Sequence, residues 1–239
     1  MVTITYARSN EGWGGYTDFL KKLIEVNSIK NVCEVGGGAN PTLPLDWLDA
    51  RGLRYTLLDV SKDELDKASS GYRKIVEDVC SRDLKLSEEF DFVFSRMLAE
   101  HVTDGELFHK NILHMLSPGG LAFHFFPTLY ALPFLANRLF PERLSSFLLD
   151  LLAPRDRYQH AKFPAYYSWC RGPTKIQIGR FNELGYQVET YIGFFGHEGY
   201  YQKIPLLRDL SVSISNVLLR HPMPGITSYA YVILRKPGR

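Results

Sequence analysis

Residues 32–42, VCEVGGGANPT, run from a short apolar, β-branched segment directly into three consecutive glycines. A strand that ends in glycines just before a helix is how α/β proteins let backbone approach a ligand at the strand's carboxyl end. A side chain at Gly36 or Gly38 would obstruct that approach, and glycine also adopts the positive φ that such a turn usually needs. This stretch therefore predicts a ligand-binding turn in an α/β fold.

The same glycines fit a dinucleotide-binding turn only in part. That turn requires the pattern G-x-G-x-x-G. Gly36 and Gly38 occupy its first two glycine positions, but Pro41 stands at the third. A nicotinamide-dependent oxidoreductase is therefore disfavoured, although it stays open as an alternative.

Four more strands are predicted before residue 127, each bordered by polar or turn residues. Residues 54–60 (RYTLLDV) place Asp59 23 positions after Gly36, where an acidic residue can accept hydrogen bonds from ribose hydroxyls. Residues 73–79 (RKIVEDV) carry Asp78 near their end. Residues 90–95 (FDFVFS) precede the segment RMLAEHV, and residues 121–126 follow the turn SPGG.

Two amphipathic helices are predicted between these strands. The first covers residues 12–27, and the second follows Thr103, which forms a capping box with Glu106. Alternating strands and helices imply a parallel sheet with helices on both faces.

The ordered segments EVGGG, LLD, EDV, FDFVFS with AEHV, and LSPGG resemble the class I S-adenosylmethionine-dependent methyltransferases, of the type 11 kind, over roughly residues 30–126. The resemblance implies a three-layer, Rossmann-like α/β sandwich. Its mostly parallel sheet would have seven strands, with the last strand antiparallel. One departure is Asn40-Pro41, where many members carry another glycine.

The resemblance also implies S-adenosylmethionine as the cofactor and a set of residues around it. These are Glu34, Gly36, Gly37 and Gly38 at the methionine end, Asp59 at the ribose, Asp78 with the Val79 backbone at the adenine, and Ser95 with Arg96 along the far wall, together with Asn40 and Val60.

After residue 127 the regular alternation stops. Residues 129–172 are apolar and interrupted by prolines, then dense in aromatic and basic residues, and we expect a helical cap over the acceptor site, because the family commonly inserts one here. The pattern then resumes with a helix, a strand over residues 186–192, a helix over residues 204–220 and a strand over residues 228–235. The last helix is predicted to turn Leu207, Leu210, Ile214, Val217 and Leu218 inward.

Length and composition favour one folded domain over residues 1–239, with 45% hydrophobic and 23% charged residues. No apolar run approaches the roughly 20 residues that span a bilayer, and the N-terminus lacks a secretion signal, so we expect a cytoplasmic protein. Cys33, Cys80 and Cys170 have the spacing of neither a disulfide framework nor a metal site, so no metal is expected.

Charge is divided unevenly between the two halves of the chain. Residues 1–128 contain 14 Lys and Arg against 19 Asp and Glu, whereas residues 129–239 contain 14 against 7. A basic second half favours an anionic acceptor or a nearby anionic surface, although a solvated basic face is an equal alternative. Peripheral membrane contact through the apolar residues 129–153 is a less favoured alternative. Because the chain has no recognised RNA-binding module, no nucleic-acid partner is expected.

Methyl transfer is an in-line displacement that needs the nucleophile about 3 Å from the methyl carbon. Oxygen acceptors usually also need a base, for which histidine suits neutral pH. The candidate bases are His101, His160 and His197, and a structural role in its loop is the alternative for His101. The sequence favours O-methylation of a small-molecule or lipid- or sugar-linked acceptor. N- or C-methylation, or a non-catalytic binding protein, are the rivals.

Overall fold

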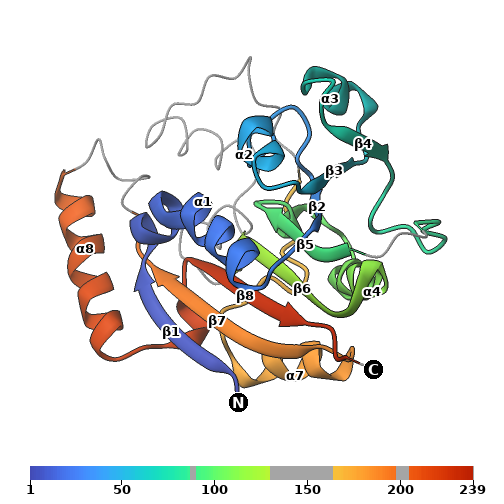
Figure 1. Ribbon diagram of the computed structural model, residues 1–239. Helices are drawn as coiled ribbons and strands as arrows, with labels where there is room; N and C mark the ends of the chain where they lie inside the picture. Colours follow the sequence, from blue (N-terminus) through green and yellow to red (C-terminus); the bar gives the residue numbers. More distant parts are fainter. Residues whose placement is uncertain (87–89, 130–163, 198–204, 239) are drawn as a thin grey trace.

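One mixed sheet of eight strands runs through the protein in the order β1-β7-β8-β6-β5-β2-β3-β4 (Figure 1). The computed structural model describes residues 1–86, 90–129, 164–197 and 205–238. The strands are β1 (Thr3–Arg8), β2 (Asn31–Val35), β3 (Arg54–Asp59), β4 (Arg73–Val76), β5 (Phe90–Arg96), β6 (Leu116–Pro127), β7 (Gln187–Phe195) and β8 (Tyr229–Arg235). All pairings are parallel except those of β8, which is antiparallel to both β6 and β7.

The predicted α/β class is confirmed, but the sheet has one strand more than the predicted seven. The additional strand is β1, which pairs with β7 along one edge of the sheet. Its residues are exposed or half-buried throughout, so the segment lacks the buried apolar run by which the inner strands are predicted. β4 also ends at Val76, which leaves Asp78 and Val79 in the loop after the strand rather than at its tip.

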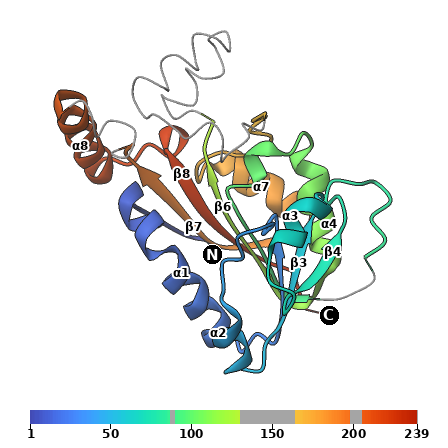
Figure 2. The same cartoon turned by 90° about the horizontal axis from the view of Figure 1, so that it is seen from above.

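Helices cover both faces of the sheet (Figure 2). They are α1 (Ser9–Val26), α2 (Leu45–Asp49), α3 (Lys62–Lys67), α4 (Gly105–Met115), α7 (Lys175–Glu183) and α8 (Pro205–Arg220), with short 3-10 turns η1 (Ala99–His101) and η3 (Pro224–Ile226). α1 starts at Ser9, earlier than predicted. α4 is capped by Asp104, whose carboxylate accepts a hydrogen bond from the Leu107 amide at 3.0 Å, so the prediction of Thr103 as the cap was wrong.

An aromatic core fixes α1 on the sheet. The Tyr16 ring stacks on Phe123 and Phe125 from β6, with centroids 5.6 and 5.5 Å away, and meets Tyr231 from β8 edge-on at 5.9 Å. Removing one such fully buried ring typically costs about 3–5 kcal/mol of stability. This core lies beside the carboxyl ends of β5 and β6, so it holds the N-terminal part of α1 close to the edge where the glycine turn lies.

The orientation of α8 differs from the prediction. Leu207, Leu210, Ile214 and Val217 are exposed, and Ser215 is the buried side chain of the helix. The cause is local: a Cβ on Gly196, just after β7, would lie 3.0 Å from Ser215 Oγ, so only a small side chain fits where α8 meets the body. The face with the small and polar residues therefore packs inward.

Candidate functional site

The turn after β2 lies where the strand order reverses. β2 pairs with β3 on one side and with β5 on the other, so the chain leaves β2 in the middle of the sheet. In open α/β sheets, ligands bind in the crevice outside the carboxyl ends of the strands at such a switch point. The predicted glycine turn therefore occupies the position where this architecture places a ligand.

The turn is built from backbone conformations that suit glycine. Gly36 has φ +77° and Gly38 has φ +43°, and the Gly36 amide donates to the Leu58 carbonyl at 2.8 Å. A Cβ added to Gly38 would lie 3.3 Å from Asp59 Oδ2. The turn thus passes directly beside the carboxylate at the end of β3, and it brings together the two sequence signals predicted to form one site.

Glu34 stabilises the end of this turn. Its carboxylate accepts hydrogen bonds from the Thr42 amide at 3.0 Å, the Thr42 hydroxyl at 2.5 Å and the Tyr55 hydroxyl at 2.5 Å. Burial raises the pKa of Glu34, and the hydrogen bonds with Thr42 and Tyr55, together with the charge of Arg96, act in the opposite direction. The structure therefore directs this side chain toward the protein, where it anchors the residues that follow Asn40.

The carboxylates predicted for the ribose and adenine lie on neighbouring loops. Asp59 is half-buried, and its Oδ1 accepts from the Ser61 amide at 2.9 Å. Val60, next to it, is exposed. Asp78 is exposed and accepts from the Cys80 amide at 2.8 Å.

Asn111 on α4 holds the loop that carries Asp78, a role that sequence reasoning missed. Its side-chain amide donates to the carbonyls of Val79 and Ser81, each at 2.8 Å. A lone Asn within an amphipathic helix pattern gives no signal of such a contact, because the loop that it holds is about 30 residues earlier in the chain.

Ser95 and Arg96, adjacent in sequence, point to different environments. Ser95 is fully buried, and its hydroxyl forms a hydrogen bond with His124 Nδ1 at 2.8 Å. This bond links β5 to β6 inside the protein. Arg96 is exposed, and its guanidinium lies 5.5 Å from the Trp13 ring centroid and 4.9 Å from that of Tyr16. Trp13 and Tyr16 thus join the site from α1, which the sequence did not predict.

Among the candidate bases, His101 ends the short turn η1 that follows β5. The segment Met97–His101 follows β5, and a Cβ on Gly36 would lie 2.9 Å from the Leu98 side chain. His101 Nδ1 lies 2.8 Å from the Pro164 carbonyl oxygen, so Nδ1 carries the proton and Nε2 the lone pair of the neutral ring. Nε2 lies 3.7 Å from Glu100 Oε1, and burial raises the pKa of Glu100 to about 8.

The other two candidates are placed differently. His197 follows β7 and is buried, with its ring centroid 5.8 Å from that of Tyr229, and burial lowers its pKa to about 4. His160 lies outside the described residues. The structure therefore places His101 in the turn after β5 and His197 after β7.

The described end of the predicted cap packs against η1 and α4. The amides of Tyr166 and Tyr167 donate to the Glu100 carbonyl at 2.7 and 3.0 Å, and the Gly105 amide donates to Ser168 Oγ at 2.9 Å. The Leu129 amide donates to the Cys170 carbonyl at 3.0 Å. Residues 130–163 of the predicted cap lie outside the described residues.

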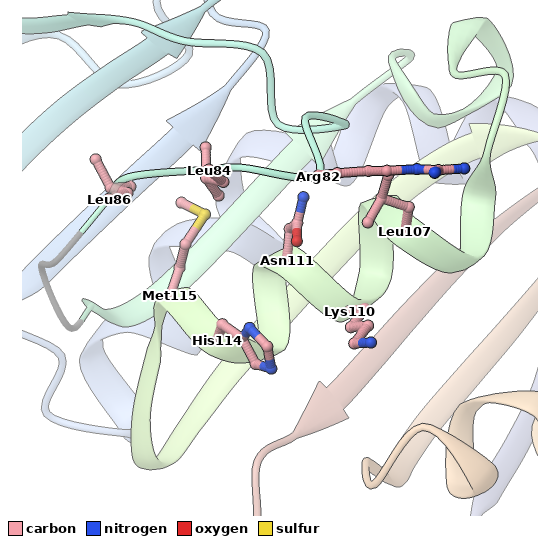
Figure 3. A pocket seen from close by; sticks show the side chains of 8 residues that line it. All are labelled: Arg82, Leu84, Leu86, Leu107, Lys110, Asn111, His114 and Met115. Atoms are coloured by element: carbon pink, nitrogen blue, oxygen red, sulfur yellow. The ribbon is translucent and has the colours of Figure 1, made fainter.

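A pocket of about 470 Å³ lies between residues 82–86, which follow the Asp78 loop, and α4. Figure 3 shows Asn111 near its centre, while the charged ends of Arg82 and Lys110 point in different directions. Because these cations do not converge, the pocket shows no built anion site. Within the described residues, no group of His, Cys, Asp and Glu could hold a metal ion, and no helix there is long and apolar enough to cross a membrane.

Comparisons with known proteins agree with this geometry. Residues 33–124 match the family described as methyltransferase domain. No curated protein matches the sequence at a significant level.

Solved structures share the fold at low sequence identity. The N-methyltransferase NodS from Bradyrhizobium japonicum is 13% identical with a TM-score of 0.56, and the similarity covers 96% of this chain and 98% of that one. Phosphoethanolamine N-methyltransferase 2 from Haemonchus contortus, in complex with S-adenosyl-L-methionine, is 17% identical with a TM-score of 0.53; 94% of this chain aligns with 53% of that protein. The [4+2]-cyclase SpnF is 14% identical with a TM-score of 0.56, covering 98% of this chain and 85% of that one.

Proposed function

We propose that this chain, whose residues 33–124 match the methyltransferase domain family, uses S-adenosylmethionine to methylate a small-molecule or lipid-linked acceptor on oxygen. The juxtaposition of Gly38 and Asp59 carries the proposal. A Cβ added to Gly38 would lie 3.3 Å from Asp59 Oδ2, so backbone without a side chain passes directly beside this carboxylate. A carboxylate at the end of the strand after a glycine turn can accept hydrogen bonds from the ribose hydroxyls of a nucleoside.

In this proposal three loops hold the cofactor. The backbone of residues 36–38 borders the methionine end, Asp59 accepts from the ribose hydroxyls, and Asp78 with the Val79 backbone meets the adenine. Glu34 and Asn111 contribute indirectly in this proposal, because each holds one of these loops in place by hydrogen bonds. When bound, S-adenosylmethionine supplies an electrophilic methyl group on a sulfonium.

His101 is the base that the geometry supports best. The contact of Nδ1 with the Pro164 carbonyl orients the ring. In this proposal Nε2 takes the proton of an acceptor hydroxyl. Glu100 Oε1 lies 3.7 Å from Nε2, and because burial raises the pKa of Glu100 to about 8, this carboxyl is largely protonated at neutral pH and faces the ring as a neutral group. His197 is the second candidate, but burial holds its pKa at about 4, which makes it a weaker base at neutral pH.

Arg96 supports an anionic acceptor. It is exposed at the carboxyl end of β5, and its guanidinium is held over the rings of Trp13 and Tyr16. A guanidinium held over aromatic rings keeps its donors available for a carboxylate or phosphate group. The acceptor would thus carry its anionic group near α1 and its nucleophile near η1.

Calorimetric titration with S-adenosylmethionine, S-adenosylhomocysteine and NAD tests the cofactor. We expect the first two ligands to bind and NAD not to; binding of NAD alone would overturn the proposal. Incorporation of labelled methyl groups into fractionated small molecules and lipids then tests turnover.

Release of labelled methanol by alkali identifies methyl esters, and mass spectrometry of the purified product distinguishes O-methyl ethers from N-methyl groups. His101→Gln should lower turnover of a hydroxyl acceptor while cofactor affinity is unchanged. Tight cofactor binding with no transfer to any fraction would indicate a non-methylating protein of the same fold.

A further inference from the structure

The hydroxyl of Tyr16 is a buried polar group that the fold leaves without a partner. Tyr16 is 1% exposed, and its hydroxyl has no hydrogen-bond partner in the part of the chain that the structure describes. By contrast, the buried hydroxyls of Tyr55, Tyr186 and Tyr231 each donate to a protein oxygen. Leaving a buried hydroxyl unpaired costs stability, so this one calls for an explanation other than packing.

Tyr16 shares its face of the sheet with Glu34 and Arg96. In the register of the parallel strands, Glu34 lies beside Phe94, which lies beside Phe123, so their side chains point to the same face. The Tyr16 ring stacks on Phe123, and Arg96 follows Phe94 by two residues on the same side of β5. Figure 2 shows α1 on this face of the sheet, with α4 and α7 on the other.

The first half of α1, which carries Tyr16, starts at the ligand-binding edge of the sheet. β1 runs parallel to β7, and β7 has the direction of β6 because both are antiparallel to β8. β1 therefore ends at the same edge as β5 and β2, and α1 begins directly after it. The glycine turn and Arg96 lie at this edge, so Tyr16 approaches the candidate site from one side.

Two charged groups of opposite sign act on the Tyr16 hydroxyl. The Arg96 guanidinium is exposed and lies 4.9 Å from the Tyr16 ring centroid. Burial raises the pKa of Tyr16 well above its usual range, the charge of Glu34 acts in the same direction, and the charge of Arg96 acts against both. The hydroxyl therefore keeps its proton at neutral pH and is available as a hydrogen-bond donor.

The amino-acid end of S-adenosylmethionine matches this arrangement of groups. It carries an ammonium and a carboxylate, and a carboxylate takes hydrogen bonds from hydroxyl and guanidinium donors. We propose that the Tyr16 hydroxyl donates a hydrogen bond to the carboxylate at the amino-acid end of the cofactor, beside the Arg96 guanidinium. Arg96 is exposed above the ring, so movement of this one side chain opens the hydroxyl to the ligand.

This inference rests on the cofactor of the proposed function and adds a side chain that fixes its amino-acid end. Arg96 has several N–H donors, so a contact with the cofactor carboxylate leaves others for an anionic acceptor. The unpaired Tyr16 hydroxyl then has a physical reason: it is satisfied only when the cofactor is bound, and the ligand-free protein carries the cost of leaving it unpaired.

Titration calorimetry with two ligands that differ by one carboxylate tests the proposal. The probes are S-adenosylmethionine and its decarboxylated form, which keeps the nucleoside, the sulfonium and the ammonium. The wild type should bind S-adenosylmethionine more tightly than the decarboxylated form. Tyr16→Phe should raise the Kd of S-adenosylmethionine by about 10-fold or more and leave that of the decarboxylated form unchanged, because the variant loses a hydrogen bond to a charged group.

Thermal unfolding of the ligand-free protein supplies a second readout and a matched control. Tyr16→Phe removes an unpaired hydroxyl, so its melting temperature should not fall below that of the wild type. Tyr186→Phe removes a buried hydroxyl that donates to the His109 carbonyl at 2.8 Å. This control should melt at a lower temperature and keep the full preference for S-adenosylmethionine over its decarboxylated form.

The outcomes separate this inference from the proposed function. An unchanged Kd of S-adenosylmethionine in Tyr16→Phe, or an equal loss of affinity for both ligands, would overturn the inference and leave the proposed function standing. A wild type that binds both ligands equally well would do the same. A wild-type chain that binds neither ligand would overturn both.

Discussion

Replacing Asp59 by alanine should weaken S-adenosylmethionine binding by about 1.5–3 kcal/mol, the range for hydrogen bonds to a charged group. The structure shows why the loss should be partial. Asp59 Oδ1 already accepts from the Ser61 amide at 2.9 Å, so Oδ2, which faces Gly38, remains for the ribose. The expected loss corresponds to roughly a 10- to 150-fold increase in Kd.

Isothermal titration measures this increase, and two further variants separate its causes. Asp59→Asn keeps an acceptor for the Ser61 amide but removes the charge, so its loss should be smaller than that of the alanine variant. Asp63→Ala removes a nearby, exposed carboxylate in the first turn of α3 and should leave Kd unchanged. A folded Asp59→Ala protein that binds the cofactor as tightly as the wild type would refute the placement of the ribose.

Three further predictions concern the turn and buried ionisable groups. Gly38→Val should abolish cofactor binding in a folded protein, because residue 38 has φ +43° and lies beside Asp59; normal heats of titration would contradict this. Burial lowers the pKa of His124 to about 3, so its contribution to stability is present above pH 6.5 and is lost as the pH falls. His124→Gln should narrow the difference in unfolding free energy between pH 7 and pH 5 by about 2 kcal/mol, and an unchanged difference in urea titrations would count against it. Burial raises the pKa of Glu100 to about 8. The contribution of its protonated carboxyl to stability is therefore lost as the pH rises from 4.5 through 8. From pH 5 to pH 8, the unfolding free energy of Glu100→Gln should rise by about 3 kcal/mol relative to that of the wild type. Unfolding free energies of the two proteins that change in parallel with pH would disprove it.

The parts of the site that could be predicted from the sequence are those with local signals. Consecutive glycines after an apolar strand, and an acid at the end of the next one, each reflect a backbone or strand-end requirement. The structure places Gly38 and Asp59 side by side because β2 and β3 are parallel neighbours in register from Asn31 with Arg54 onward. The class of fold follows from the same alternation, and it is confirmed.

The parts that were missed depend on tertiary contacts. Trp13 and Tyr16 reach Arg96 only because α1 begins at Ser9 and packs on the aromatic core. Asn111 acts on a loop about 30 residues away in sequence. For α8, the periodicity correctly indicated an amphipathic helix, but it does not specify which face meets the body, and the small residues beside Gly196 decided that.

The antiparallel strand β8 has a consequence for the order in which the chain folds. β8 lies between β6 and β7 in the sheet. Among the described strands, the pair β1–β7 is therefore hydrogen-bonded to the rest of the sheet through β8, residues 229–235. During synthesis the block β2 to β6 can assemble early, whereas the pair β1–β7 stays unattached until the final strand leaves the ribosome. Pairings between such distant segments close slowly. A ribosome-stalled chain that ends before residue 229 should therefore keep β1 open to proteases, and completion of β8 should close it in one late step.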